Sequence, residues 1–319
     1  MQIRKYFSSI LSIPLQEINN IIDKKSNRYH KYSVLKKNNV GKRTIYHPSR
    51  EIKSLQYILV SNIFSKLKTS QYAMAYIKGK KNPLRENAQK HSNFRYNLRI
   101  DFENFFASII FDDLKYYLKK HEEILKDDIE INKKFYKDIE KLCFPKISSN
   151  KLPVGAPSSP MISNIVMYEL DIKISNLGKK MSNDRRFCYT RYADDIVFST
   201  NQKGLCADFY KKFKILIKDN DTPNLKINES KTRFLSKAGQ RYITGVKITP
   251  QGNISIGRER KRKIKKMIFK HKKDGLNPKK LKKLRGLLAF LVSVEPDYYD
   301  RLVINKGKIV NDILKGKHE

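Results

Sequence analysis

The chain of 319 residues carries 68 Lys and Arg against 31 Asp and Glu, a formal net charge of +37, and 39% of its residues are hydrophobic. This composition allows a large buried core, and its charge fits nucleic acid best, with an anionic membrane surface as the weaker alternative. Three cysteines without metal-like spacing argue against a disulfide framework, and no stretch approaches the roughly 20 apolar residues of a membrane span, so we expect a cytoplasmic protein.

The N-terminal part of the chain alternates helical and extended patterns. Residues 1–35 are basic and are predicted to be helical, and residues 44–46 form a short strand that Pro48 stops. Residues 51–69 carry apolar side chains at the spacing of one helix face. The pattern predicts a helical unit with one short strand.

An acidic residue follows the next predicted strand. Residues 97–101 alternate between the two faces of a strand, and Asp101 stands at its end, where catalytic groups are commonly displayed. Taken alone, Asp101 could instead cap the next helix, since Asp is a common N-cap residue. Residues 109–143, rich in lysine, and residues 160–177 are predicted to be helical from their apolar spacing.

A second acidic position lies in a predicted hairpin. Residues 187–191 and 196–200 are aromatic and β-branched, as in strands, and Ala193-Asp194-Asp195 between them suits a turn. Adjacent buried carboxylates repel each other unless a cation lies between them, and such oxygen ligands suit Mg²⁺. Turn chemistry alone is the alternative. The Asp pairs at 112–113 and 127–128 lie in lysine-rich helical segments, and we expect them at the solvated surface.

Three acidic side chains from neighbouring strands predict a two-metal site. Asp101, Asp194 and Asp195 could hold two divalent ions about 4 Å apart, which would clamp the attacking and leaving oxygens of an in-line phosphoryl displacement. Further strands are predicted near 233–236 and 241–248. Strands mixed with helices in this order predict an α+β fold with helices packed on one face of the sheet.

The C-terminal part of the chain is strongly basic. Between Arg258 and Arg285 there are fifteen Lys and Arg against Glu259 and Asp274. An apolar stripe predicts a basic helix that breaks at Gly275 and is followed by a second helix. The segment either grips a nucleic-acid duplex or is only a solvated charged face.

Four short motifs resemble the palm motifs of reverse transcriptases, in the same order. They are Asp101 with Phe105-Phe106, Leu152-Pro153-Val154-Gly155-Ala156-Pro157-Ser158-Ser159-Pro160, Tyr192-Ala193-Asp194-Asp195, and Asn228-Glu229-Ser230-Lys231-Thr232. Two further elements resemble those of retron reverse transcriptases, namely Asn87-Ala88-Gln89-Lys90-His91 for N-A-x-x-H and Ile243-Thr244-Gly245 for V-T-G, with Ile in place of Val. From about residue 40 to the C-terminus, the chain therefore resembles a bacterial retron reverse transcriptase of the group II intron-like superfamily.

This resemblance implies the right-hand fold of polymerases, with fingers, palm and thumb. Residues 1–96 would form N-terminal helices and the fingers, and residues 97–250 the palm, whose antiparallel sheet carries the catalytic carboxylates. Part of 109–160 could belong to the fingers instead. Residues 251–319 would form a helical, basic thumb that binds RNA or duplex.

The resemblance also implies roles for individual residues. Asp101, Asp194 and Asp195 would be catalytic and would be the ligands of two Mg²⁺ ions, for which Mn²⁺ can substitute. Phe106 would be the steric gate that excludes the 2′-hydroxyl of ribonucleotides. The residues expected to contact the incoming nucleotide are Arg43, Lys53, Phe102, Phe106, Gly155 and Lys231. Those expected in RNA binding or in the family elements are Asn87, Ala88, His91, Ile243, Thr244, Gly245, Arg258, Arg260, Lys261, Arg262, Lys265, Lys266 and Arg285.

The implied activity is RNA-directed DNA synthesis. Such an enzyme binds a cognate structured non-coding RNA and uses dNTPs to copy part of it into single-stranded DNA (msDNA), primed by a 2′-hydroxyl of that RNA. The resemblance also implies a role in bacterial anti-phage defence, together with a separate effector protein. The alternatives are another defence-associated or group II intron-like reverse transcriptase, or a non-catalytic RNA-binding scaffold. Val154 departs from the family, which commonly has Gln at this position.

Overall fold

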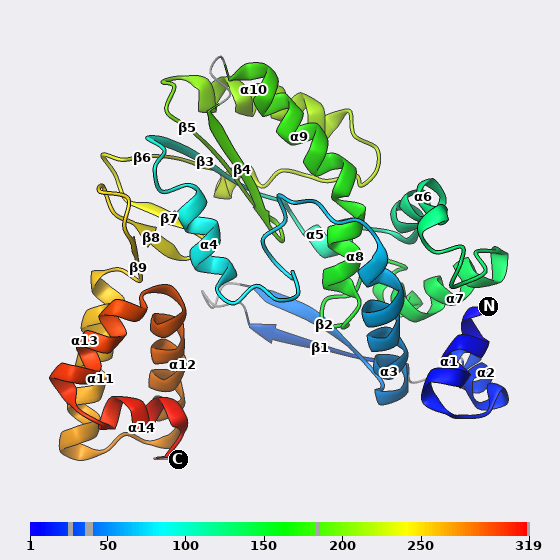
Figure 1. Ribbon diagram of the computed structural model, residues 1–319, viewed down its shortest axis with the longest axis horizontal. Coiled ribbons are helices and arrows are strands. Elements are labelled where there is room, and N and C mark those ends of the chain that lie inside the picture. The colour runs from blue at the N-terminus through cyan, green and yellow to red at the C-terminus, as the bar shows by residue number, and fades with distance from the viewer. Residues whose placement is uncertain (25–27, 36–40, 183–185, 318–319) are drawn as a thin grey trace.

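The computed structural model describes residues 1–24, 28–35, 41–182 and 186–317. Figure 1 shows a central sheet with helices around it, an N-terminal pair of helices at one end and a C-terminal group of helices at the other. Helices and antiparallel sheets together confirm the predicted α+β class. None of the helices in the described ranges is long and apolar enough to cross a membrane.

The N-terminal residues form two helices and then a strand. The helices are α1 (Ile3–Leu11) and α2 (Leu15–Asp23), and the strand β1 (Tyr29–Leu35) pairs with β2 (Lys42–Pro48). Arg4 holds the helices in place, because its guanidinium lies 2.6 Å from the carboxylates of both Asp23 and Asp138. The helical prediction for residues 1–35 is wrong at 29–35, where the chain pairs antiparallel with β2 along its whole length.

A long helical segment follows β2. Ser49 accepts a hydrogen bond from Ile52 N at 3.3 Å and so caps the start of α3 (Arg50–Ile58). The segment continues through a π-helical turn (Leu59–Ile63) and a 3₁₀ turn (Phe64–Lys66). This agrees with the helical spacing predicted for residues 51–69.

Four antiparallel strands form the central sheet in the order β4-β5-β3-β6. Their bounds are β3 (Tyr96–Asp101), β4 (Phe187–Tyr192), β5 (Asp195–Thr200) and β6 (Arg233–Ser236). The β4–β5 hairpin confirms the strand-turn-strand pattern predicted for residues 187–200. Its aromatic residues anchor it, because Phe198 stacks on Phe209 with ring centroids 3.9 Å apart.

Helices cover both faces of this sheet. They are α4 (Pro83–Lys90), α9 (Tyr168–Met181) and α10 (Leu205–Lys218). Thr190 of β4 bonds His91, which ends α4, whereas the next residue, Arg191, bonds Asp171 of α9. Successive residues of a strand point to opposite faces, so α4 and α9 lie on opposite sides. The prediction of helices on one face only is therefore wrong.

Shorter helices complete the main hydrophobic core. They are α5 (Phe105–Ser108), α6 (Phe111–Lys120), α7 (Lys133–Cys143) and α8 (Ser159–Val166), with 3₁₀ turns at Glu122–Ile124, Lys146–Ser148 and Glu229–Lys231. Asp113 is buried rather than at the surface, contrary to our prediction for the 112–113 pair. Its carboxylate accepts a hydrogen bond from Ile110 N at 2.8 Å, one of the backbone groups that a helix start leaves without a helical partner.

The remaining elements form what we call the C-terminal lobe. They are β7 (Arg241–Ile243), β8 (Val246–Ile248), β9 (Ile254–Ser255), α11 (Arg258–Asp274), α12 (Pro278–Val294), α13 (Pro296–Lys306) and α14 (Ile309–Lys315). Their buried side chains form a second hydrophobic core, which Ala88 of α4 and Val197 of β5 join. The predicted boundary at residue 250 falls inside the three-stranded sheet, so this core begins before it.

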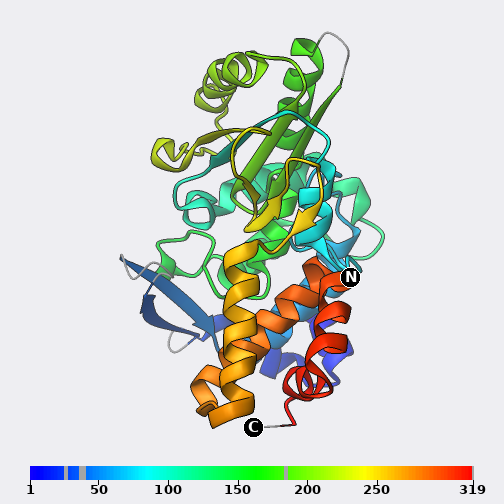
Figure 2. The same ribbon diagram turned by 90° about the vertical axis from the view of Figure 1, so that its left-hand side faces the viewer.

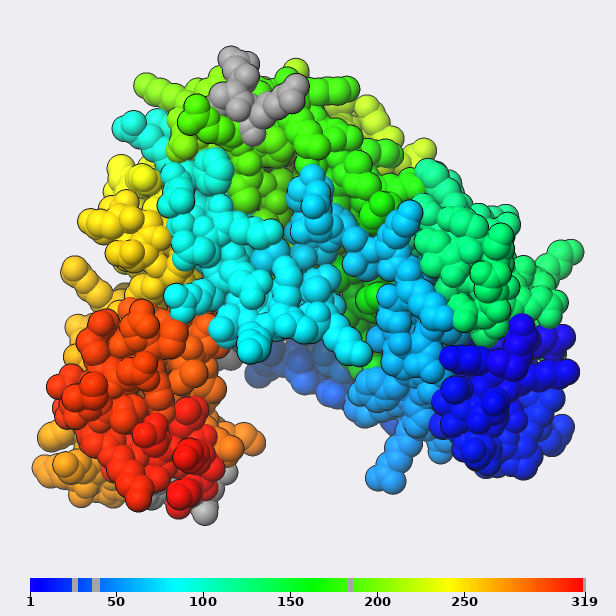
Figure 3. Space-filling model, in the orientation of Figure 1, coloured from blue at the N-terminus to red at the C-terminus, as the bar shows by residue number. Residues whose placement is uncertain are grey.

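The helices of the lobe project to one side of the molecule (Figure 1). Figure 2 shows α11 leading from the three-stranded sheet into the C-terminal helices. Figure 3 shows that the surface is hollowed between these helices and the N-terminal part of the chain. The molecule thus has an open concave side, with the lobe as one wall.

Candidate active site

Antiparallel pairing brings the three predicted catalytic carboxylates to one end of the central sheet. Asp101, the last residue of β3, lies directly opposite Asp195, the first residue of β5. Asp194 precedes it in the turn, and its backbone carbonyl accepts a hydrogen bond from Phe102 N at 3.3 Å. Ala193 adopts a left-handed φ of +57°, which lets the chain reverse sharply and leaves both aspartates at the tip of the hairpin.

The site concentrates negative charge in a partly buried place. Burial raises the pKa of Asp194, and the neighbouring charge of Asp101 raises it further. Burial and then the charge of Asp194 raise the pKa of Asp195 to about 6. Arg43 acts in the opposite direction on the pKa of Asp194, as does Arg99 on that of Asp195. A cation at this point would relieve the repulsion between the carboxylates.

A lysine contacts the first of these carboxylates. Lys231 ends the 3₁₀ turn at Glu229–Lys231, and its Nζ donates a hydrogen bond to Oδ1 of Asp101 at 2.7 Å. The backbone is tied at the same point, because Asn228 N donates to the carbonyl of Asp101 at 2.8 Å. The motif at 228–232 is thus fixed beside the end of β3.

The donor chemistry fits a hard divalent cation. Carboxylate oxygens are the ligands that Mg²⁺ prefers, and buried carboxylates without a cation are unfavourable. Among the residues that the structure describes, no group of three or more His, Cys, Asp or Glu side chains is arranged to hold a metal ion. In this arrangement the positive charge at Asp101 comes from Lys231.

The three phenylalanines after β3 have different surroundings. Phe102 is 1% exposed and packs against Phe105 and Phe213, with ring centroids 6.2 Å and 6.4 Å away. We expected Phe102 to contact a nucleotide, but its side chain belongs to the core, so the prediction is corrected. Phe106 is half-buried, and its ring meets that of Tyr76 edge-on at 6.4 Å.

Tyr76 lies beside the carboxylates, although no sequence pattern predicted it there. It is 47% exposed and adopts a left-handed φ of +61°. Burial and then the charge of Asp194 raise the pKa of its hydroxyl. Tyr76 lies in a loop before α4, where no hydrophobic period marks a residue, so only the fold brings it near Asp194.

The loop at 152–160 packs against the hairpin of β1 and β2. Tyr46 N donates a hydrogen bond to the carbonyl of Val154 at 2.8 Å. Gly155 has φ of +110°, and a Cβ there would lie only 2.8 Å from Cγ2 of Ile45. The close approach that requires glycine is therefore made by β2 of this chain, whereas we had expected it from a template or nucleotide.

The two basic residues predicted to contact the triphosphate lie on different elements. Arg43 is an exposed residue of β2, and its charge lowers the pKa of Asp194. Lys53 lies on α3, with Nζ 2.6 Å from Nε2 of His47. Arg43 is thus electrostatically coupled to the carboxylates, whereas the contact found for Lys53 is with a neighbouring histidine.

A buried ion pair supports the β4–β5 hairpin from the α9 side. The guanidinium of Arg191 and the carboxylate of Asp171 are 2.8 Å apart, and both side chains are 0% exposed. Arg191 also donates to Oδ1 of Asn164 at 3.1 Å and to the carbonyl of Ala193 at 3.4 Å, and Tyr189 donates to Asp171 at 2.6 Å. The sequence carries no local signal for this pairing, since its members lie 20 residues apart.

The two retron-like elements lie together in the interior. Asn87, Ala88 and His91 are buried at the end of α4. Thr244 and Gly245 form the turn between β7 and β8, with φ of +46° and +80°, and Ile243 is buried before it. Asn87 reaches the turn, because its Nδ2 lies 3.5 Å from Oγ1 of Thr244.

The predicted RNA-binding cations of the C-terminal lobe fall into two groups. Four are exposed along α11: Arg258, Arg262, Lys265 and Lys266. The others have contacts within the protein. Arg260 donates to the carbonyl of Gly245, Lys261 pairs with Glu295, and Arg285 lies against Gly316. The internal contacts of Arg260 and Lys261 give those two residues a structural role.

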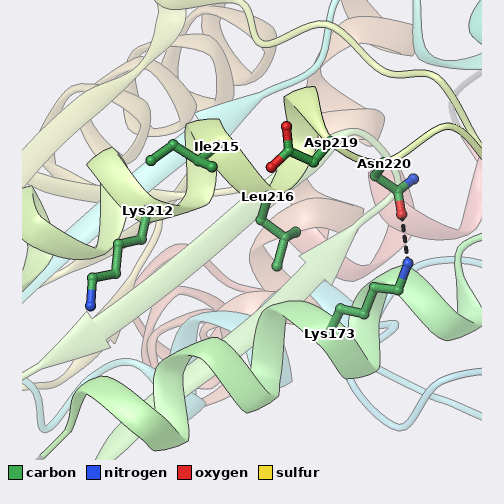
Figure 4. A pocket seen from close by; sticks show the side chains of 6 residues that line it. All are labelled: Lys173, Lys212, Ile215, Leu216, Asp219 and Asn220. Atoms are coloured by element: carbon green, nitrogen blue, oxygen red, sulfur yellow. Dashed lines mark hydrogen bonds between the residues drawn. The ribbon is translucent and has the colours of Figure 1, made fainter.

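A separate hollow of about 400 Å³ lies over α9 and α10 (Figure 4). Lys173 lines it, and its Nζ donates a hydrogen bond to Oδ1 of Asn220 at 3.0 Å. Ile215 and Leu216 supply its apolar part. None of the predicted site residues lines this hollow, so it is distinct from the carboxylate site.

Comparison with known proteins places these features in a family. Residues 34–265 match the family model "Reverse transcriptase (RNA-dependent DNA polymerase)". The chain is 36% identical over 276 residues to the retron Ec73 reverse transcriptase of Escherichia coli, covering 85% of each chain. It is 33% identical over 285 residues to the retron Ec83 reverse transcriptase of the same species, covering 88% of each.

A solved structure supports the fold. A telomerase from Candida albicans, in complex with a fragment of telomeric RNA, matches with a TM-score of 0.51 at 12% identity. The match covers 98% of this chain and 61% of the telomerase chain. Reverse transcriptases generally use divalent metal ions. The extent of these matches shows that the chain belongs to the retron reverse transcriptases, which are RNA-dependent DNA polymerases.

Proposed function

We propose that this reverse transcriptase copies part of a cognate structured non-coding RNA into single-stranded DNA, starting from a 2′-hydroxyl of a guanosine in that RNA. The product would be a branched RNA–DNA molecule, made in the bacterial cytoplasm. The observation that carries this proposal is the placement of Asp101 opposite Asp195, next to Asp194 and within 2.7 Å of Lys231. Similarity to two retron reverse transcriptases of Escherichia coli supports the self-primed reaction.

We assign the chemistry to this carboxylate cluster. Asp101 and Asp194 would hold two Mg²⁺ ions, with Asp195 as a further ligand or a close electrostatic support. When bound, the ions would neutralise charge on the nucleotide phosphates and favour the ionised primer hydroxyl. Lys231 would turn from Asp101 toward the leaving pyrophosphate and stabilise its charge. Because such transfers depend on positioning and charge, loss of one carboxylate is expected to cost orders of magnitude in rate.

The nucleotide is expected to lie between the carboxylates and the hairpin of β1 and β2. Arg43 would meet the triphosphate, since its charge already acts on Asp194. Phe106 would lie under the sugar and exclude a 2′-hydroxyl, with Tyr76 packed against its edge. Val154 offers only its backbone, whose carbonyl is engaged by Tyr46 N. The role of Gly155 is then to let β2 approach this loop.

The concave molecule would be divided as in a right-handed polymerase. Residues 1–96 would be the N-terminal helices and fingers, residues 97–250 the palm, and residues 251–319 the thumb. The hollow in Figure 3 would receive the RNA–DNA duplex. The exposed cations of α11 would meet its phosphates, because such contacts supply affinity that is independent of sequence.

The system is expected to serve anti-phage defence through a separate effector protein. A second class of reverse transcriptase remains the alternative, in which the polymerase uses an added primer. Both hypotheses require the same carboxylates, whereas the self-primed reaction also requires the cognate RNA. The two therefore separate in an experiment that supplies or withholds that RNA.

The test is expression with the adjoining non-coding region, followed by extraction of nucleic acid. We expect a discrete branched DNA from the wild type and none from Asp194→Asn/Asp195→Asn. The matched control, Asp112→Asn/Asp127→Asn, changes two exposed aspartates and should leave the product unchanged. Activity only on an added template and primer would overturn self-priming. DNA synthesis by the Asp194→Asn/Asp195→Asn protein would overturn the assignment of the catalytic site.

A further inference from the structure

His91 occupies a buried position between α4 and the central sheet. It is 0% exposed, and both ring nitrogens have partners. Nδ1 lies 2.7 Å from Oγ of Ser199 on β5, and Nε2 lies 2.7 Å from Oγ1 of Thr190 on β4. Burial lowers the pKa of the ring to about 3, so His91 is neutral at physiological pH.

The neighbouring bonds determine which nitrogen carries the proton. The hydroxyl of Thr190 has one hydrogen, which it donates to Oδ1 of Asn87 at 2.6 Å. Oγ1 of Thr190 must therefore accept from Nε2–H of His91. On the other side, Nδ2 of Asn97 donates to Oγ of Ser199 at 2.6 Å, and the Ser199 hydroxyl is left to donate to Nδ1. These side chains form a row from Asn97 through Ser199, His91 and Thr190 to Asn87. Each one donates a hydrogen bond to the next.

The row of bonds continues into the C-terminal lobe. Nδ2 of Asn87 donates a hydrogen bond at 3.5 Å to Oγ1 of Thr244, in the turn between β7 and β8. The next residue of that turn, Gly245, accepts a hydrogen bond through its carbonyl from Arg260 of α11. The Asn-Ala-x-x-His and Ile-Thr-Gly elements are thus two parts of one connection between the central sheet and the first helix of the lobe.

The same row holds the strand that leads to the catalytic carboxylates. Thr190 lies four residues before Asp194 on β4, and Arg191 beside it is held on the opposite face by Asp171. β4 is an edge strand of the central sheet. On its outer side it pairs only at Arg191, among the described residues, where Arg191 N donates to the carbonyl of Tyr72 at 2.8 Å and Met74 N donates to that of Arg191 at 2.7 Å. Buried polar contacts on both faces of β4 therefore add to the restraint that this short pairing gives.

We propose that His91, as a neutral ring protonated at Nε2, is a positioning residue that fixes the C-terminal lobe relative to β4, the strand that leads to Asp194. A duplex gripped by α11 is then held in register with the carboxylates. This inference rests on the proposed function, because it takes the lobe as the duplex-binding wall and the hairpin as the catalytic site. It goes beyond that function because it assigns both retron-like elements to one role, which is to hold the C-terminal lobe in place relative to the central sheet.

Nuclear magnetic resonance of the ¹⁵N-histidine-labelled full chain tests the proton arrangement without any activity. Six histidines are present, and the signal that disappears in His91→Gln belongs to this ring. We expect a protonated Nε2 and an unprotonated Nδ1 that persist from pH 8 to pH 5, since burial lowers the pKa of the ring to about 3. A proton on Nδ1, or titration near the ordinary histidine value, would overturn the proposed chain of bonds.

A matched pair of variants at Thr190 tests the positioning. Thr190→Val keeps the shape and removes the hydroxyl, whereas Thr190→Ser keeps the hydroxyl. Dyes at two exposed positions, Lys266 of α11 and Lys211 of α10, report the placement of the lobe by energy transfer. We expect a broader distance distribution in Thr190→Val and a wild-type distribution in Thr190→Ser. Equal distributions in wild type and Thr190→Val would overturn the positioning role.

The kinetic constants of the two Thr190 variants should differ in the same way as their dye distances. For Thr190→Val we expect KM for a template–primer duplex to rise about tenfold, the size of one lost buried hydrogen bond, with little change in kcat. Thr190→Ser should restore KM. A fall in kcat alone would contradict the proposal. Failure of the proposed function would look different, because Asp194→Asn/Asp195→Asn would remain active while the His91 signal and the dye distances stayed as expected.

Discussion

The Nζ atom of Lys231 lies 2.7 Å from Oδ1 of Asp101 and donates a hydrogen bond to it. Asp101 in turn lies opposite Asp195 across β3 and β5. The Lys231 side chain is 56% exposed, so it is free to turn toward a phosphate while its backbone stays fixed beside β3. In the proposed function, this ammonium would neutralise the carboxylate before the nucleotide binds and the pyrophosphate as it leaves.

Replacing Lys231 by Met is expected to lower kcat by about 100-fold, the scale of losing one positioned charge or proton donor. Lys231→Arg should recover part of the rate, because it keeps the charge. Lys218→Met, which changes an exposed lysine of α10, is the matched control. Single-turnover incorporation measures the effect, and an unchanged rate in Lys231→Met would exclude this role.

Asp195→Asn is expected to abolish synthesis and yet to stabilise the metal-free protein. Burial and the charge of Asp194 raise the pKa of Asp195 from 3.8 to about 6, so its charge is unfavourable at pH 7. Removing that charge should raise the free energy of unfolding by up to about 3 kcal/mol, at about 1.4 kcal/mol per pKa unit.

Thermal unfolding with and without Mg²⁺ completes this test. We expect Mg²⁺ to raise the Tm of the wild type, because a bound ion relieves the repulsion between the carboxylates. The gain should be smaller in Asp195→Asn. An Asp195→Asn protein that is less stable than the wild type without Mg²⁺ would contradict the charge repulsion inferred at this site.

Breaking the buried pair under the hairpin should be costly. Arg191→Met leaves Asp171 with an uncompensated charge at 0% exposure, and we expect a loss of about 3 to 5 kcal/mol in the free energy of unfolding. Arg191→Met/Asp171→Leu should lose much less than the sum of the single changes. Urea unfolding of the four proteins gives the coupling energy, and additive losses would show that the two residues act independently.

Phe106→Val is expected to admit ribonucleotides. A smaller side chain would leave space for the 2′-hydroxyl, so the preference for dNTP over rNTP should fall by about 100-fold, while stability changes little because Phe106 is half-buried. Phe105→Val is the contrasting variant, since Phe105 is in the core and its truncation should cost about 2 kcal/mol of stability instead. Incorporation assays with each nucleotide decide the matter, and an unaltered preference in Phe106→Val would remove its role as the gate.

The burial of His91 should make the protein less stable as the pH is lowered. Its folded-state pKa of about 3 lies below the ordinary value of about 6.5. The unfolded chain therefore binds a proton below pH 6.5 that the folded chain does not, and His91 by itself lowers the free energy of unfolding by about 1.4 kcal/mol for each pH unit between pH 6 and pH 4. His91→Gln should reduce that slope by one proton. Equal slopes in the two proteins would show that the ring is protonated in the folded state.

Local patterns in the sequence were sufficient for the elements that display the carboxylates. The alternation of aromatic and β-branched residues defined the β4–β5 hairpin, and Gly275 marked the break between α11 and α12. These features depend on neighbours along the chain, because side-chain direction repeats every two residues in a strand and about every 3.6 in a helix. The family motifs then indicated which acidic residues are candidates for catalysis.

The tertiary structure alone decided which charged and aromatic side chains are engaged inside the protein. Phe102 is a core residue because α10 packs over the end of β3, and Lys261 is paired because α12 brings Glu295 to it. On one face of β4 Arg191 meets Asp171 of α9, and on the other face Thr190 meets His91. Such contacts join residues far apart in sequence, and burial makes a polar group depend on whichever partner the packing supplies. No local period encodes that partner.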